Sequence, residues 1–192
     1  MRKLSVWFAS MILVGAMMLV FGACCAEGSD WQDRLSQVEG VTRVEAIPLD
    51  PSAQFFEEKY LVVFEQPLDW NDPDAGSFPQ RVEIGLRKDA PFAVMETNGY
   101  TLRDKYPGVQ EGLAELGKDD APEMGRLLSA NYVNVEHRFF GDSRPADMSN
   151  TDTRYWEYHT AENAAGDYHR IYQALSPLLG DAWVATGSRA GK

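Results

Sequence analysis

The chain has 192 residues, of which 44% are hydrophobic, and its 29 acidic and 18 basic residues give a formal net charge of −11. This negative balance argues against a nucleic-acid-binding protein, because such proteins neutralise phosphates with lysine and arginine. The length suits a single domain that is stabilised by a packed core.

The first 26 residues have the pattern of an export signal. Residues 2–3 are basic, residues 4–21 are apolar and residues 22–26 are small residues or cysteines, which predicts a cleaved signal peptide. Two interpretations stay open: ordinary cleavage, or a lipoprotein signal in which Cys24 or Cys25 carries the lipid and attaches the protein to a membrane. Either way we expect a secreted or cell-envelope protein. Both cysteines lie here, so no disulfide is expected in the body.

A leader arm or linker is expected next, followed by the folded domain. Residues 27–59 mix charged and small residues with two prolines, which favours an irregular segment. The domain is expected over residues 60–192. Strand-like runs at 60–64 and 81–86 are joined by turn-forming residues, and they predict an antiparallel pair with one solvated face.

Strand-like and helical segments then alternate along the chain. The expected elements are a buried strand over 91–95, two helices between 108 and 130 divided at Pro122, a strand over 132–137, a helix from 160 closed by Pro177, and a strand over 182–186. This order predicts the α/β class, with an open, mostly parallel sheet and crossover helices. Glu96, His137 and Ser188 follow successive strands, so they are expected to converge at the carboxyl ends of the sheet, where active sites gather.

Ser188 lies in a turn of small residues after the last expected strand. A nucleophile elbow needs small residues two positions before and after its serine, and Thr186 and Ala190 occupy those positions. The glycines at 187 and 191 do not fit the usual G-x-S-x-G register. The alternative interpretation is a surface turn, for which these residue types are also common.

Three histidines are available as a catalytic base. His169 and Asp167 are expected on or near the surface of the last helix, and His159 is expected at a helix start or in packing. His137 ends a strand beside Arg138; it is either a buried histidine that fixes the exit loop or a direct participant in chemistry. No two histidines or cysteines have metal-ligand spacing, so we predict no metal and no cofactor.

The residues from Glu96 to Tyr100 are expected to form a substrate loop. In hydrolases of this architecture the loop after the third strand supplies an oxyanion-hole N–H, and Gly99 would let the main chain approach the substrate. Glu96 is either a receptor for the cationic amino terminus of a peptide or a solvated carboxylate.

Six stretches of the chain together resemble one known family. They are EQPLD (65–69), FPQR (78–81), ETNGY (96–100), VEHRFFGDSRP (135–145), AAGDYHRI (164–171) and WVATGS (183–188). In this order they resemble serine peptidase family thirty-seven, the secreted tripeptidyl aminopeptidases of the α/β-hydrolase fold that are related to prolyl carboxypeptidase.

The resemblance implies a peptidase that releases tripeptides from free amino termini through an acyl-enzyme. It implies that Ser188 is the nucleophile and that Glu96, Asn98, Gly99 and Tyr100 belong to the oxyanion or substrate loop. It also implies that His137 and Arg138 contact the site residues without touching the substrate. Peptides with free amino termini are then the expected partners.

The sequence also departs from the family pattern. Thr186 stands where the family has a glycine, Trp70 stands where it has a histidine, and the chain stops at Lys192, before the expected aspartate and histidine of the triad. We therefore expect an incomplete domain, inactive alone, with an open apolar edge that promotes aggregation. Two alternatives stay open: an esterase of the same fold, and a non-catalytic exported remnant or lipoprotein.

Overall fold

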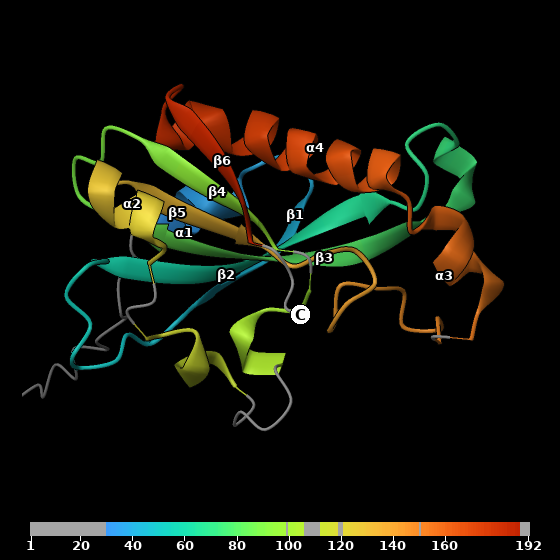
Figure 1. Ribbon diagram of the computed structural model, residues 1–192, viewed down its shortest axis with the longest axis horizontal. Coiled ribbons are helices and arrows are strands. Elements are labelled where there is room, and N and C mark those ends of the chain that lie inside the picture. Colours follow the sequence, from blue (N-terminus) through green and yellow to red (C-terminus); the bar gives the residue numbers. More distant parts are fainter. Residues whose placement is uncertain (1–29, 99, 106–111, 119–120, 150, 189–192) are drawn as a thin grey trace, which may run out of the picture.

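The computed structural model describes residues 30–98, 100–105, 112–118, 121–149 and 151–188. They form one six-stranded sheet in the order β1-β2-β3-β5-β4-β6 (Figure 1). The strands are β1 (Val41–Ala46), β2 (Glu58–Pro67), β3 (Ser77–Leu86), β4 (Ala93–Asn98), β5 (Asn131–Val135) and β6 (Trp183–Ser188). The helices are α1 (Asp30–Ser36), α2 (Glu123–Leu128), α3 (Thr153–Tyr158) and α4 (Ala161–Leu179), with 3-10 turns at Pro73–Ala75, Arg103–Lys105 and Leu113–Glu115.

The sheet is mixed, which confirms the α/β class and corrects the expectation of a mostly parallel sheet. The pairings β1–β2, β2–β3 and β3–β5 are antiparallel, whereas β4 pairs in parallel with both β5 and β6. Helices lie between the strands of both parallel pairs along the chain, and the antiparallel half includes the β2–β3 hairpin.

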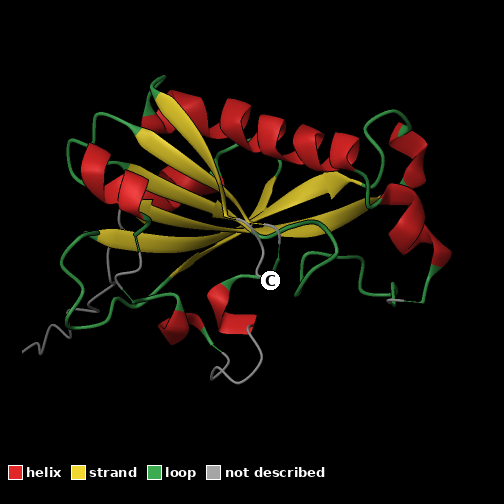
Figure 2. Ribbon diagram, viewed as in Figure 1, coloured by secondary structure: helices red, strands yellow, loops and turns green. Residues whose placement is uncertain are grey.

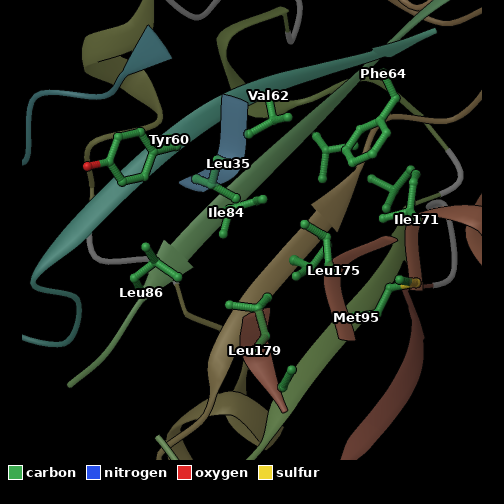
Figure 3. Close-up of a cluster of buried hydrophobic side chains, with 14 residues drawn as sticks. Leu35, Tyr60, Val62, Phe64, Ile84, Leu86, Met95, Ile171, Leu175 and Leu179 are labelled. Carbon is green, nitrogen blue, oxygen red and sulfur yellow. The ribbon is translucent and has the colours of Figure 1, made fainter. Parts of the chain in front are cut away.

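One face of the sheet is covered by α4 and α1 (Figures 1 and 2). Apolar side chains of α4 meet the alternate inward residues of the central strands in a single cluster, which Figure 3 shows. Its labelled members are Leu35, Tyr60, Val62, Phe64, Ile84, Leu86, Met95, Ile171, Leu175 and Leu179. The cluster explains the helical spacing of Ile171 and Leu175, which face the sheet, whereas Tyr172 is exposed.

The opposite face of the sheet is also covered by other parts of the chain. The prediction that one face of the β2–β3 hairpin is exposed to solvent is therefore wrong. Leu61 of β2 is buried with Ile47, Leu102 and Leu116, which come from the connections on that side. Lys59 is buried there too: its Nζ pairs with Glu83 and donates to the carbonyl of Leu116. Long connections therefore replace helices as the cover of this face.

The segment expected to be a leader arm is largely part of the domain. From Asp30 it forms α1 and then β1, which pairs with β2 from Val41 to Ala46 as the edge strand. Leu35 is fully buried in the main cluster. The sequence pattern missed this because α1 has only seven residues, too few for a helical period to stand out.

Replacing Leu35 by alanine is expected to lower the free energy of unfolding by about 2–5 kcal/mol, the cost of deleting a fully buried leucine side chain. Urea unfolding of wild type and variant would measure the loss. Gln37→Ala, at an exposed position two residues from Leu35, is the control. If Leu35→Ala loses no more unfolding free energy than the control, residues 30–46 would be a leader arm, as the sequence predicted, and not part of the domain.

The long helix confirms its prediction except at its end. Thr160 caps α4 by accepting a hydrogen bond from the Asn163 main chain at 3.1 Å. Pro177 does not close the helix, which continues to Leu179 and ends at Gly180 with φ of +88°. Pro177 lacks the N–H that would bond to the carbonyl of residue 173, and only two residues of α4 follow it.

The region between β4 and β5 is less helical than predicted. The described residues contain the 3-10 turn Leu113–Glu115 and α2, which begins directly after Pro122. Pro122 therefore marks a helix start, as proline does at such positions. Among the described helices none is long and apolar enough to cross a membrane. The expected signal peptide and its cysteines lie outside the described residues.

Candidate functional site

The carboxyl ends of the three parallel strands come together, as the sequence predicted. In the register of the sheet Thr97 of β4 is opposite both Val135 of β5 and Gly187 of β6, and Asn98 is opposite Ser188. The three strands therefore end at the same level of the sheet, where Figure 2 shows them converging. Ser188 is the last residue of β6. Its predicted place in the turn after the strand is therefore corrected, because the strand continues to Ser188 itself. Residues 189–192 and Gly99 lie outside the described residues.

Glu96 lies in β4 and not in the loop that follows, which corrects its predicted position. Its carboxylate accepts a hydrogen bond from the Tyr132 hydroxyl at 2.6 Å, and its side chain is half-buried. It is therefore neither a freely solvated carboxylate nor part of the turn. The segment expected to be the substrate loop therefore begins three residues later, because β4 continues to Asn98.

His137 and His159 form a pair of rings beside the exit from β5. Their ring centroids are 5.0 Å apart, and Phe140 lies within 5.8 Å of both. Nδ1 of His137 is 3.0 Å from the Arg138 carbonyl, so the imidazole is half-buried and oriented by the exit loop. This geometry fits the first of the two roles predicted for His137, and it places His159 in packing. His169 is exposed on α4.

Acidification is expected to destabilise the fold through this histidine pair. Burial holds the pKa of both His137 and His159 below the ordinary value of 6.5. The unfolded chain therefore binds protons that the folded chain does not. The histidine contribution to stability is fully present above the unfolded pKa, and it is lost as the pH falls from there through the lowered pKa of the folded state. Urea titrations between about pH 7.5 and pH 5 should show this loss.

His159→Phe keeps the aromatic packing and removes one of the two groups, so it should flatten the pH dependence of the unfolding free energy. The exposed His169→Phe is the control for a general effect of losing an imidazole. An unchanged pH dependence in His159→Phe would show that acidic groups alone account for the acid sensitivity.

Arg138 is fully buried and joins four parts of the chain. Its guanidinium makes two parallel hydrogen bonds to Asp167 of α4, at 2.8 and 2.7 Å. It also donates to the carbonyls of Leu68 and Tyr158, each at 2.8 Å. Arg138 thus connects the exit of β5 to α4, to the end of β2 and to the end of α3. Asp167 was expected on the helix surface, and this prediction is wrong. Its side chain is buried, where the guanidinium of Arg138 balances its charge.

Trp70 takes part in the same arrangement. Its indole Nε1 donates to Asp167 at 3.0 Å, and its main-chain N–H donates to Asn163 at 3.0 Å. Gly166 leaves the space that the indole occupies on α4. Trp70, which departs from the family pattern, is therefore a donor to the buried aspartate.

The edge of the sheet beyond β6 has no partner strand among the described residues. Between β6 and α4 lies a hollow of about 210 Å³ with mostly apolar walls, which include Met95, Tyr172 and Trp183. An open apolar edge was expected there. In the part of the chain that the structure describes, no group of three histidine, cysteine or acidic residues is placed to bind a metal ion.

An α/β sheet whose parallel strands end together beside a serine has the layout that enzymes of this class use for catalytic groups. Comparison with known proteins identifies the family. A model described as PS-10 peptidase S37 matches residues 25–192, and the chain therefore belongs to this peptidase family. The match also includes the segment that forms α1 and β1.

One curated relative supports the same assignment. The chain is 34% identical over 203 residues to the prolyl tri/tetrapeptidyl aminopeptidase of Streptomyces mobaraensis. The alignment includes 100% of this chain and 36% of the relative, so the chain spans about a third of the relative's length.

Proposed function

We propose that this chain provides the nucleophile-bearing part of an exported serine aminopeptidase of the α/β-hydrolase fold. The proposed substrates are peptides with a free amino terminus, from which tripeptides are released. The observation that carries the proposal is the register that sets Ser188 beside Asn98 at the carboxyl ends of the parallel strands, in a chain of a peptidase family. The aminopeptidase activity named for the relative supports the substrate class.

The proposed reaction is acyl transfer to Ser188. The serine hydroxyl gives its proton to a histidine and attacks the scissile carbonyl, the leaving amine takes up that proton, and water then hydrolyses the acyl-enzyme. Main-chain N–H groups of the loop after β4 would bind the oxyanion. We assign the triad histidine and aspartate to polypeptide matching the rest of the relative, since Nδ1 of His137 is already engaged by the Arg138 carbonyl. Residues 1–192 alone are then expected to be inactive.

Glu96 is the candidate for binding the substrate's amino terminus. It lies at the carboxyl end of β4 with a hydrogen bond to Tyr132 that orients its carboxylate. A carboxylate held in this way can receive an ammonium group by a charge-assisted hydrogen bond.

Export by residues 1–26, with or without lipidation at Cys24 or Cys25, belongs to the same proposal. Mass spectrometry of the mature amino terminus would test it.

The test is a substrate comparison with the complete gene product. Chromogenic amides of proline-containing tripeptides should be cleaved when the amino terminus is free and resist cleavage when it is acetylated. Hydrolysis of simple esters without amide cleavage would instead indicate an esterase. A folded protein that cleaves neither and does not react with a fluorophosphonate probe would indicate a non-catalytic exported protein.

A further inference from the structure

Glu136 is a fully buried carboxylate directly after β5, and apolar packing does not explain it. Oε1 accepts hydrogen bonds from the Thr101 hydroxyl at 2.6 Å and from the Leu102 main chain at 2.8 Å. Oε2 accepts a hydrogen bond from the Ser143 hydroxyl at 2.7 Å. The carboxylate therefore bonds to the segment after β4 and to the exit loop of β5 together.

Arg81 provides the positive charge next to this carboxylate. Its guanidinium lies 3.2 Å from Glu136 and 2.5 Å from Asp104, and all three side chains are buried. Burial alone would lower the pKa of Arg81, but Glu136 and Asp104 raise it above its ordinary value. Buried ion pairs add little stability compared with apolar residues of similar volume, so stability alone is a weak reason for a charged group here.

Gly141 makes room for the Glu136–Thr101 hydrogen bond. Its φ is +49°, and a Cβ at this position would lie 2.6 Å from the Thr101 hydroxyl oxygen. A larger residue would therefore displace Thr101 or the carboxylate. The absence of a side chain at residue 141 therefore allows the Glu136–Thr101 hydrogen bond to form.

His137 adds a bond to the same segment. Its main-chain N–H donates to the Tyr100 carbonyl at 2.9 Å. Glu136 and His137 thus bind three consecutive residues, Tyr100 to Leu102. On the other side of Gly99, Asn98 is fixed by its register with Ser188. Asn98 is therefore held by its pairing in the sheet, and Tyr100 is held by its hydrogen bond to His137.

We propose that Glu136 is a positioning residue, which sets the main chain after β4 at the position where it binds the oxyanion formed at Ser188. This inference rests on the proposed function. Glu136 does not touch the substrate; it acts through Tyr100–Leu102. Gly141 of the exit loop leaves room for the Glu136 carboxylate, and Arg81 of β3 balances its charge.

Glu136→Gln in the complete gene product tests the proposal, because glutamine keeps the shape and removes the charge. We expect kcat to fall about 100-fold, as it does when an oxyanion donor is displaced, with KM changed less than about threefold. Hydrogen exchange of the Leu102 amide should accelerate in the same variant.

The matched control is Asp104→Asn. This substitution removes the other carboxylate beside Arg81, and Asp104 is not the carboxylate that accepts hydrogen bonds from Thr101 and Leu102. The control should leave both readouts near wild type. Thr101→Val, which removes one donor, should lower kcat about tenfold and serves if Glu136→Gln does not fold.

Each result decides between roles. Faster exchange at Leu102 with an unchanged kcat would show a structural anchor and overturn the positioning role. Unchanged exchange at Leu102 would overturn the anchor itself. If the wild-type protein has no peptidase activity, the proposed function fails and the catalytic purpose of the anchor fails with it, whereas exchange at Leu102 still decides whether Glu136 holds this segment.

Discussion

Replacing Ser188 by alanine is expected to lower kcat of the complete gene product on a tripeptide amide by about 10⁶-fold, the loss seen when a serine peptidase loses its nucleophile. Alanine cannot form the acyl-enzyme, so only the stabilisation by the oxyanion hole and by substrate binding would remain. The fold should persist, because Ser188 is the last residue of β6 and alanine is smaller than serine. Initial rates and fluorophosphonate labelling of wild type and variant would measure the effect.

Ser176→Ala is the matched control for this prediction. Ser176 is a serine of α4 whose hydroxyl donates to the Tyr172 carbonyl at 2.6 Å, so its loss changes a helix contact and no expected chemistry. Labelling and kcat should stay at wild-type levels in the control. Retention of labelling in Ser188→Ala would place the nucleophile on another residue and reject the proposed mechanism.

Replacing Arg138 by methionine is expected to lower the free energy of unfolding by about 3–5 kcal/mol, because it leaves the carboxylate of Asp167 buried and unpaired. The carbonyls of Leu68 and Tyr158 lose their donor as well. Since a typical domain has a total stability of only about 5–15 kcal/mol, the variant should be close to unfolding at room temperature. Urea unfolding followed by tryptophan fluorescence would measure the loss.

A double variant separates the buried charge from the loss of packing. Arg138→Met combined with Asp167→Leu removes both charges and should recover a large part of the lost stability, as replacement of whole buried ion pairs does. Arg154→Met breaks an ion pair with Asp147 and Asp152 at the surface and should change stability little. A double variant that is no more stable than Arg138→Met would show that the carbonyl contacts of Arg138 outweigh the charge pair.

Much of the fold was predictable because apolar periodicity reports local structure. The expected strands correspond to β2 to β6: β3 was predicted from alternating residues, and β4 and β6 from short apolar runs, whereas α4 was predicted from apolar residues spaced by three to four. The buried position of Asp167 was also within reach. It lies three residues after Ala164 and four before Ile171, both buried, so it shares the face of α4 that turns to the sheet.

Other features had no local signal. α1 and β1 are too short to show a period, and their place was decided when Leu35 entered the main cluster. The solvated face expected for the hairpin was wrong because residues 47 and 116, distant in sequence, cover it. Short-range patterns do not report such contacts, since they depend on how separate segments pack.

The sequence by itself determined the α/β class, the peptidase family and the presence of a strand leading to Ser188, because these depend on residue periodicity and on short motifs. Only the tertiary structure decided that the sheet is mixed, that Glu96 belongs to β4, and that Arg138 and Glu136 are buried with their partners. The physical reason is that a charged side chain is buried only where opposite charge and hydrogen-bond donors or acceptors surround it. For Glu136 those partners come from Arg81, Thr101 and Leu102, which the fold alone brings together.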